Sequence, residues 1–501
     1  MHRRRGRIGI VATLTLFFGV FAAQPGPGVQ AQTQLPVVSA QIAGTTTGPA
    51  MPSGFLGFSF ETRALHVYTG RDPTAVNPVL VQLIRALNPG QTPILRIGGD
   101  STDQTWWPIR GVIPPGGIGY GLTKGWLRTT RALATATGAK LIMGINLAAG
   151  RPAFAAQEAR AIIQGLGRQN LAALEIGNEA DLYGQFAWYR DRRGRVVFAR
   201  PRNYDLNDFI HDFASWRAAM PKIPLAGPAF AGTTWMDGLG TFLNAAPGVS
   251  YVTFHRYPLR GCIADPTSPS YASIPNLLGD TSSAGLAQQV VPYVATTHSR
   301  GLPFRLDELN SAACTGRSGV SDTFASSLWV LDTLFNLASA GVDGINLHTL
   351  PNAAYEPFSF THRGKAWKAF VHPVYYGMKL FADAFPPGAK LLSVSAPAGP
   401  VKVWATLDTA GRIRVVLINK DPSAAVSVHL QLPGNGSPVT AESLSAPALS
   451  ATKGVALGGQ TYGTSTNTGK LAGQPSTNHI GPLLGTYSVP LPAGSAIMLT
   501  R

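Results

Sequence analysis

Eight apolar segments of strand length recur along the chain, and this repetition constrains the fold more than any other feature of the sequence. The segments are Phe55–Glu61, Ile94–Gly99, Lys140–Asn146, Leu171–Glu179, Pro224–Ala229, Tyr251–Tyr257, Pro303–Glu308 and Gly344–Thr349. Their composition is nearly continuously apolar instead of alternating, which is expected of parallel strands that are buried on both faces. We therefore expect these segments to pair in one parallel sheet.

Helix patterns lie between the apolar segments. Val76–Leu87 places its apolar residues on one stripe, and Ser321 or Asp322 can cap a helix that stops near Gly341. Eight strand–helix units over roughly 300 residues predict an α/β fold, the (β/α)8 TIM barrel. A doubly wound sheet is the alternative, but no glycine-rich phosphate loop follows the first strand.

The composition changes near Phe385, where the helix patterns stop. The β-like segments that follow are Val401–Leu407, Ile413–Asn419, Val426–Leu432, Tyr487–Leu491 and Ala496–Thr500. Short strands separated by Gly, Pro and Ser clusters predict a C-terminal β-sandwich domain. We expect the barrel to span residues 53–384 and the sandwich residues 385–501. Residues 32–52 hold an earlier strand, Pro36–Ile42, which we expect to join the sandwich.

The N-terminus has the pattern of a secretory signal peptide. Four arginines within residues 3–7 precede an apolar run, residues 8–23, and a small-x-small cleavage site ends at Ala31. The alternative is a single membrane anchor, for which this run is slightly short. We interpret residues 1–31 as a signal peptide and expect a secreted, periplasmic or cell-envelope protein with no stable membrane span after its removal.

The chain is strongly basic. Its formal net charge of +16 falls to +12 once the four arginines of the signal segment are removed. A basic surface attracts anionic partners, and in an exported protein we expect acidic polysaccharides, anionic glycosides or the cell envelope instead of nucleic acid. Solvated charge is the simplest alternative. The Arg-rich stretch Tyr189–Arg202 is likewise either a guide for anionic substrate or a solvated loop.

Polar residues gather where the predicted strands end. They are Glu61, Asp100, Asn146, Asn178, Glu179, His255, Tyr257, Asp307, Glu308 and His348. The active sites of such barrels lie at the C-terminal ends of the strands. Burying this many polar groups has a cost unless they are paired or used. The set therefore predicts a functional site at that face.

Two glutamates of this set suit glycoside hydrolysis, which needs two carboxyl groups on either side of the sugar carbon. Glu179 ends strand four and Glu308 ends strand seven, across the barrel mouth. A separation of about 5–5.5 Å implies retention of configuration, and about 6.5–9.5 Å implies inversion. Negative charge on Glu308 should raise the pKa of Glu179 and keep that acid protonated.

Other catalytic arrangements find less support. No Gly-x-Ser-x-Gly elbow precedes a helix, and His255 and His348 lack the spacing of a His-rich metal site. Two Cys are too few for a metal site built from soft ligands. We expect no metal and no cofactor, and both His should line a sugar pocket.

Two motifs, Leu-Glu-Ile-Gly-Asn-Glu at 174–179 and Arg-Leu-Asp-Glu-Leu-Asn-Ser at 305–311, resemble those of retaining glycosidases with the acid/base on strand four and the nucleophile on strand seven. More narrowly, the chain resembles glycoside hydrolase family 79, the heparanase and β-glucuronidase family. Supporting motifs are Leu-Arg-Ile-Gly-Gly-Asp at 95–100, His-Arg-Tyr at 255–257 and Gly-Val-Ser-Asp-Thr-Phe-Ala at 319–325. The resemblance covers the barrel and the C-terminal β-domain.

This resemblance implies a covalent glycosyl intermediate on Glu308 and acid, then base, roles for Glu179. The implied substrate contacts are Glu61 and Asp100 with sugar hydroxyls, Asn178 near the 2-hydroxyl, and Tyr257 beside the nucleophile. Each assignment agrees with the donor and acceptor capacity of these side chains. For Glu61 and Asp100 the alternative is turn capping or pairing with Arg96.

The chain departs from the family pattern after the nucleophile. Where heparanase-like members hold the uronate carboxylate with a Tyr and a Gly, this sequence has Ala313 and Thr315. Ala313 has no side-chain donor. Either Arg317, Tyr355 or the Thr315 hydroxyl binds the carboxylate, or the substrate is not a uronate.

Cys262 follows strand six and Cys314 follows strand seven, so they lie in adjacent loops on one face. An even number of Cys in an exported protein permits a disulfide. We predict that these two are bonded and pin the nucleophile loop; two free thiols are the alternative.

The sequence thus predicts a secreted retaining β-glycosidase, most similar to β-glucuronidases, that acts on carbohydrate. A β-glycosidase of the same barrel type acting on a neutral sugar is one alternative. A non-catalytic carbohydrate-binding surface protein on an inactive barrel is the other, although both Glu179 and Glu308 are present.

Overall fold

Eight parallel strands close into a barrel in the computed structural model, which describes residues 35–434 and 436–501. They are β2 (Leu56–Glu61), β3 (Ile94–Gly98), β6 (Lys140–Ile145), β7 (Leu171–Ile176), β10 (Leu225–Phe230), β11 (Val249–Arg256), β13 (Phe304–Leu309) and β15 (Gly344–Thr349). The strands follow one another around the barrel in chain order, and the pairing of β15 with β2 closes the ring. This confirms the predicted (β/α)8 fold.

The fourth strand is shorter than predicted. β7 ends at Ile176, not at Glu179. Gly177 and Glu179 have φ angles of 80° and 52°, outside the extended region, so they leave the strand ladder. Glu179 therefore stands on the turn that follows the strand.

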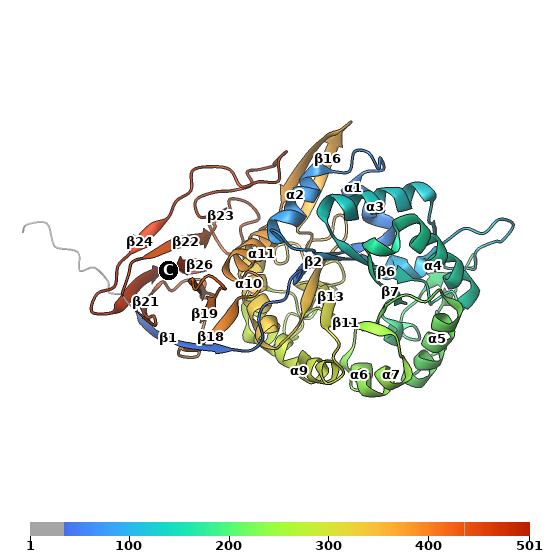
Figure 1. Cartoon of the computed structure of the whole chain (residues 1–501), viewed down its shortest axis with the longest axis horizontal. Helices are drawn as coiled ribbons and strands as arrows, with labels where there is room; N and C mark the ends of the chain where they lie inside the picture. The colour runs from blue at the N-terminus through green and yellow to red at the C-terminus, as the bar shows by residue number, and fades with distance from the viewer. Residues whose placement is uncertain (1–34, 435) are drawn as a thin grey trace, which may run out of the picture. The chain divides into compact units, whose positions relative to one another are not determined.

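Helices surround the barrel strands (Figure 1). The longer ones are α2 (Pro78–Leu87), α3 (Lys124–Thr137), α4 (Pro152–Leu166), α5 (Leu206–Ala219), α9 (Ala284–His298), α10 (Phe324–Ser339) and α11 (Pro373–Ala384). Shorter ones are α1 (Leu65–Thr69), α6 (Thr233–Met236), α7 (Leu239–Ala245), α8 (Ile274–Leu278), η1 (Thr62–Ala64), η2 (Asp100–Gln104), η3 (Arg168–Asn170), η4 (Ala180–Leu182) and η5 (Asp280–Ser282). In α2 the predicted apolar stripe is buried, and the Asn77 side chain accepts from the backbone N–H groups of Val79 and Leu80.

Two-stranded ribbons decorate the loops. They pair β4 (Thr105–Trp106) with β5 (Tyr120–Gly121), β8 (Tyr189–Arg190) with β9 (Val196–Val197), β12 (Leu259–Arg260) with β14 (Ala312–Ala313), and β16 (Phe358–Arg363) with β17 (Ala366–Val371). The β12–β14 ribbon joins the loops that follow strands six and seven of the barrel.

A ten-stranded sheet forms the second domain within the described residues. Its strands are β1 (Val37–Thr47), β18 (Lys390–Ser395), β19 (Val401–Leu407), β20 (Ile413–Asn419), β21 (Val426–Gln431), β22 (Val439–Ser445), β23 (Ala456–Leu457), β24 (Asn478–Ile480), β25 (Thr486–Leu491) and β26 (Ser495–Thr500). Val428 on β21 and Leu499 on β26 share one core although their strands lie in different halves of the sheet. The sandwich-like domain is therefore a single curled sheet. The N-terminal β1 pairs with β18 and β21 inside it.

α10 begins differently from the prediction. Neither Ser321 nor Asp322 caps it; the helix starts at Phe324 after Thr323, and no side chain caps it. Its first N–H groups donate instead to backbone carbonyls of the β-domain, from Phe324 to Ala451 and from Ala325 to Leu449. A helix leaves its first N–H groups without partners of its own, and here a neighbouring domain supplies them.

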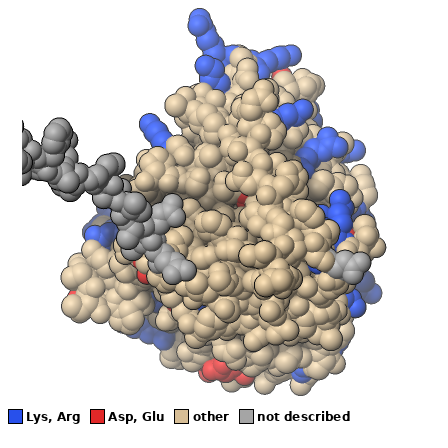
Figure 2. All heavy atoms as spheres, turned by 90° about the vertical axis from the view of Figure 1, so that its left-hand side faces the viewer, with Lys and Arg blue, Asp and Glu red and all other residues tan. Residues whose placement is uncertain are grey.

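A face of the molecule that includes the β-domain shows few Asp and Glu side chains, while Lys and Arg lie mainly near its margin (Figure 2). Within the described part of the chain, no helix is long and apolar enough to cross a membrane. The predicted signal peptide, residues 1–31, lies outside the described residues.

A buried ion pair joins the barrel to the β-domain. The Lys420 ammonium lies 2.5 Å from Asp332 on α10 and 3.0 Å from the Ser283 hydroxyl. Trp404 of β19 donates its indole N–H to the other Asp332 oxygen at 3.0 Å, and its ring stacks on Phe335. The Ser283 hydroxyl also donates to Asp332 at 2.7 Å, so Asp332 accepts from donors of both domains.

We expect Asp332→Ala to lower the free energy of unfolding by about 3–5 kcal/mol, because it leaves the buried Lys420 charge only the 3.8 Å contact with the exposed Asp280. Lys402→Ala is the matched control. Its partner Asp280 is 60% exposed, and loss of such an exposed pair should cost less than about 1 kcal/mol. Urea unfolding of both variants measures the two changes in the free energy of unfolding. Equal changes would contradict the larger contribution that we assign to the buried pair.

Candidate active site

The Arg96 guanidinium lies at the centre of the barrel mouth and is completely buried. Its Nε lies 2.7 Å from Glu175 and 3.4 Å from Asp307, and its Nη1 lies 2.6 Å from Glu308. Its Nη2 donates to the Asn178 side-chain oxygen at 2.8 Å. One cation from β3 thus holds carboxylates from two other strands and the amide that precedes Glu179.

Glu308, near the end of β13, is held by donors on both oxygens. Arg96 binds Oε2, and the Tyr257 hydroxyl donates to Oε1 at 2.9 Å. Burial by itself raises the pKa of Glu308, but His348, His255, Arg96 and the Tyr257 hydrogen bond lower it, and the net pKa lies well below the usual range. Since burial lowers the pKa of His348, and that of His255 to about 4, Arg96 and Tyr257 carry this effect at neutral pH. Glu308 is ionised there.

Glu179 has the opposite environment. Its Oε1 lies 2.9 Å from Nδ1 of His255. Burial raises its pKa well above the usual value, and the negative charges of Glu308, Asp100 and Asp181 raise it further. Burial is thus the larger cause, ahead of the Glu308 charge that the sequence suggested.

The left-handed backbone of Glu179 is unusual for a residue with a side chain and costs about 1–3 kcal/mol. Two hydrogen bonds hold it there: the Glu179 N–H donates to the Ala229 carbonyl at 2.9 Å, and its carbonyl accepts from Leu182 N–H at 2.8 Å.

The two glutamates face each other. A carboxylate oxygen of Glu179 and one of Glu308 lie within 4.8 Å of each other, and both lie within 4.8 Å of a His255 nitrogen. Glu175, His255 and Asp307 form a second cluster of this kind. Such sets resemble metal ligands, but Arg96 already supplies the positive charge at both clusters, so we interpret them as one network of charged and polar groups around Arg96.

Glu61 and Asp100 lie beside this pair, but Glu61 also has a structural task. Its carboxylate accepts from the N–H groups of Asp100 and Ser101 and from the Ser101 hydroxyl, so it caps η2. Burial, with the charges of Asp100 and Glu308, raises the pKa of Glu61 to about 7. Asp100 is exposed and accepts from the Asn178 amide at 3.2 Å, so it does not pair with Arg96.

Aromatic residues line the other side. The Tyr257 ring lies 6.2 Å from Tyr355, and Tyr355 lies 6.0 Å from His348. His348 is 3.6 Å from Glu308 and 3.7 Å from Glu61. The structure therefore brings Tyr355 and His348 to the glutamate pair together with Tyr257 and His255.

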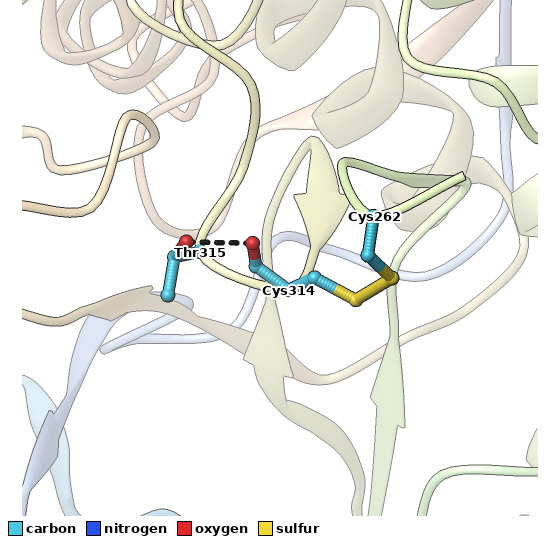
Figure 3. The surroundings of a disulfide bond; sticks show 3 residues. All are labelled: Cys262, Cys314 and Thr315. Carbon is cyan, nitrogen blue, oxygen red and sulfur yellow. Dashed lines mark hydrogen bonds between the residues drawn. A yellow bond between two sulfur atoms is a disulfide. The ribbon is translucent and has the colours of Figure 1, made fainter. Parts of the chain in front are cut away.

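The loop after Glu308 is closed by a disulfide between Cys262 and Cys314, whose Cα atoms are 5.7 Å apart (Figure 3). It closes a separation of 52 residues, which the chain-entropy model values at about 4 kcal/mol. Cys314, Thr315 and Gly316 follow one another in left-handed conformation. A Cβ on Gly261 would lie 2.1 Å from the Gly316 carbonyl oxygen, so only glycine fits against this turn.

Thr315 and Arg317 do not direct their side chains as the sequence suggested. The Thr315 hydroxyl donates to the Cys314 carbonyl at 2.6 Å (Figure 3). The Arg317 guanidinium lies over the Tyr271 ring, 4.3 Å from its centroid. Thr315, Arg317 and Tyr355 are the three candidates for binding the uronate carboxylate. Among these three, the Tyr355 side chain is the one that contacts residues next to Glu308, namely Tyr257 and His348.

The Arg-rich stretch is only partly available for substrate. Arg195 pairs with Asp191, and Arg200 pairs with Asp212 and donates to two barrel-loop carbonyls. Trp188, directly before the β8–β9 ribbon, donates its indole N–H to the Asp103 carbonyl at 3.0 Å. This contact holds the ribbon against η2, which also contains Asp100.

Sequence reasoning missed Arg96 as the centre of the site, together with Glu175 and Asp103. Asp103 accepts from the N–H groups of Leu147, Ala148 and Asn178, and so aligns three loops. The signal for Arg96 and Glu175 was present: each is a charged residue inside an otherwise apolar strand buried on both faces. Such a residue needs a buried partner of opposite charge.

Comparisons with known proteins agree with this geometry. Residues 403–498 match the glycosyl hydrolase family 79 C-terminal beta domain. The chain is 23% identical over 449 residues to a protein named beta-glucuronidase from Neurospora crassa, covering 78% of this chain and 77% of that protein. It is 26% identical over 274 residues to a beta-glucuronidase from Aspergillus niger, covering 50% of this chain and 47% of that protein.

Solved structures show the same fold. A 4-O-alpha-L-rhamnosyl-beta-D-glucuronidase from Fusarium oxysporum 12S superposes with a TM-score of 0.69 at 19% identity, covering 92% of this chain and 100% of that one. The GH51 arabinofuranosidase from Xanthomonas axonopodis pv. citri superposes with a TM-score of 0.65 at 15% identity, covering 92% and 99%. A barrel with a curled β-domain and two facing carboxyls defines a glycoside hydrolase. The chain is similar to glycoside hydrolase family 79, most directly through residues 403–498, which match the C-terminal beta domain of that family.

Proposed function

We propose that this chain hydrolyses β-glucuronides with retention of configuration, with Glu308 as nucleophile and Glu179 as acid/base. The observation that carries the proposal is the short distance between the two carboxyls, within 4.8 Å, together with their opposite pKa shifts. Retention requires a separation of about 5–5.5 Å, because one carboxylate must attack the sugar while the other donates a proton. Inversion leaves room for a water between them.

The chemistry then proceeds in two steps. The Glu308 carboxylate attacks the anomeric carbon while protonated Glu179 gives its proton to the departing glycosidic oxygen, which leaves a glycosyl ester on Glu308. Water next attacks the same carbon, Glu179 takes the water proton, and Glu308 leaves as a carboxylate. Arg96 and Tyr257 stabilise Glu308 whenever it is ionised.

For the uronate carboxylate we propose the turn at Cys314–Gly316 and the Tyr355 hydroxyl as the binding site. Successive backbone N–H groups in a turn form a concavity that binds anions, and this turn needs no side-chain donor at Ala313. The Thr315 carbonyl accepts from Ala354 N–H at 2.8 Å, which ties the turn to the segment carrying Tyr355. The name shared by the fungal relatives supports a glucuronide substrate.

We also propose that the protein is exported and that residues 1–31 are its signal peptide. The basic and apolar pattern of these residues supports it, as does the Cys262–Cys314 disulfide, since disulfides persist in oxidising compartments.

Substitution of the two glutamates tests the mechanism. Glu308→Ala should abolish turnover, because no other carboxylate can form the glycosyl ester. Glu179→Ala should slow cleavage of alkyl glucuronides by about 10²–10⁴-fold, and azide should restore turnover of an aryl glucuronide by giving a β-glycosyl azide. Glu442→Ala, in β22 of the β-domain, is the matched control. Substantial activity in Glu308→Ala would overturn the assignment.

A panel of aryl β-glucuronide, β-glucoside and β-xyloside tests specificity. We expect the glucuronide to have the highest kcat/KM, and Tyr355→Phe to raise KM for the glucuronide alone. Preference for the glucoside or xyloside would favour the neutral-sugar enzyme. Absence of hydrolysis throughout the panel would favour the non-catalytic carbohydrate-binding protein.

N-terminal sequencing of the protein secreted by an expressing bacterium tests export. We expect the mature chain to begin at Gln32, directly after the predicted cleavage site. Recovery of the intact N-terminus in the membrane fraction would support the anchor instead.

A further inference from the structure

The His255 imidazole connects Glu179 to a carboxyl that the mechanism does not use. Its Nδ1 lies 2.9 Å from Glu179 Oε1, and its Nε2 lies 3.5 Å from Asp307 Oδ1. Asp307 and His255 are completely buried. Within the described residues, His255 Nε2 and both Asp307 oxygens have no partner with hydrogen-bond geometry, and Asp307 Oδ2 lies 3.4 Å from Arg96 Nε.

Charge balance requires a proton among the buried carboxyls here. Two arginines, Arg96 and Arg305, share the barrel interior with Glu175, Asp307 and Glu308, and each is nearly or completely buried. Three ionised carboxylates would leave a buried net negative charge, at a cost of several kcal/mol. One proton on a carboxyl makes this group of five neutral.

Asp307 is the carboxyl that suits this proton. Glu175 and Glu308 lie 2.7 and 2.6 Å from Arg96, whereas Asp307 lies 3.4 Å away. Arg305 donates to Asn346 and to the carbonyls of Gly54, Phe55 and Ile345. Burial raises the pKa of Asp307 well above its usual value, and Glu175 raises it further.

The position of this proton decides the tautomer of His255. Burial, then Arg96, lower the His255 pKa to about 4, so near neutral pH the ring carries one proton. Asp307 Oδ2 faces the Arg96 Nε–H, which leaves Oδ1 to carry the carboxyl proton toward His255 Nε2. A ring that accepts at Nε2 has its own proton on Nδ1, directed at Glu179 Oε1.

We propose that neutral Asp307, acting through His255, is a positioning residue that keeps the catalytic proton of Glu179 on the oxygen facing the substrate. With Nδ1–H donating to Oε1, the acid proton must sit on Oε2, from which it can pass to the glycosidic oxygen. In the other tautomer Nδ1 accepts a hydrogen bond from Glu179, so the acid proton is directed at His255 instead of the sugar. The same arrangement serves the second step, when Oε2 takes the proton from water.

The titratable and charged groups that face Asp307 and His255 come from β3, β7, β11, β13 and β15 and from the turn that carries Glu179. Around Asp307 they are Arg96, Glu175, His255, Arg305 and Glu308; around His255 they are Arg96, Glu175, Glu179, Asp307, Glu308 and His348. Glu175 is the competing acceptor for the Asp307 proton. If Glu175 carried this proton instead of Asp307, His255 could carry its own proton on Nε2.

Nitrogen-15 NMR of the full chain labelled at histidine distinguishes these states and needs no substrate. The His255 signals are identified by their absence in His255→Gln. We expect a protonated Nδ1 and an unprotonated Nε2 near neutral pH, both in the native protein and in Asp307→Asn, whose amide N–H also donates to Nε2. A protonated Nε2 in the native protein overturns the proposal.

Leaving-group dependence gives the functional readout and rests on the proposed acid role of Glu179. Asp307→Val should lower kcat/KM for an alkyl β-glucuronide by about 10–100-fold and leave a dinitrophenyl glucuronide, which needs no acid, nearly unchanged. Asp307→Asn should restore the alkyl substrate and keep the native pH profile, which also shows that the Val effect is not misfolding. An equal loss on both substrates, or a downward shift of the alkaline limb in Asp307→Asn, overturns the proposal.

Glu158→Gln is the matched control, since it exchanges another buried carboxyl for an amide on α4, where Glu158 accepts from the Asn146 N–H. It should leave the leaving-group dependence unchanged. Because the NMR measurement needs no substrate, it tests the proposed His255 tautomer separately from the proposed hydrolysis of glucuronides. A native protein inactive on all glucuronides would refute the proposed function, whereas the tautomer would still be measured.

Discussion

The Arg96 guanidinium is the interaction on which the barrel mouth depends. A cation buried without water is tolerated only where acceptors surround it, and Arg96 has them on every nitrogen: Glu175, Glu308 and Asn178. Because a guanidinium is planar and its donors are fixed, these partners must approach from set directions. One side chain from strand two therefore aligns groups from strands four and seven, which the chain separates by more than a hundred residues.

Glu179 and Glu308 differ in protonation state because the Arg96 guanidinium binds only Glu308 directly. Glu308 is bound directly by Arg96 and Tyr257, so its charged form is favoured despite burial. Glu179, one residue beyond the amide that Arg96 binds, meets a neutral imidazole. Burial therefore dominates at Glu179, and its neutral form is favoured. Two residues of one type acquire opposite protonation states through a single cation placed nearer to one of them.

The sequence predicted the elements that depend on the periodicity of apolar residues. It did not predict the features that depend on a partner residue from elsewhere in the chain. The eight barrel strands and the polar groups at their ends follow from buried apolar segments, since parallel strands bring their carboxyl ends together. The strand ending at Ile176 was predicted too long because Gly177 and Glu179 adopt positive φ, which an apolar pattern does not reveal. The role of Arg96 was missed because knowing which strands face it requires the closed barrel.

The start of α10 shows the same limit of the sequence analysis and links the β-domain to the loop that follows Glu308. Local sequence favoured a side-chain cap, but carbonyls of Leu449 and Ala451 take the first N–H groups of the helix. Directly before that helix, Ser321 accepts from the hydroxyl of Ser311, three residues after Glu308, at 2.9 Å. The β-domain therefore fixes the helix start, the helix start fixes Ser321, and Ser321 holds the loop that carries the disulfide. Since this support runs through backbone and hydroxyl groups, the β-domain is part of the scaffold of the strand that carries Glu308.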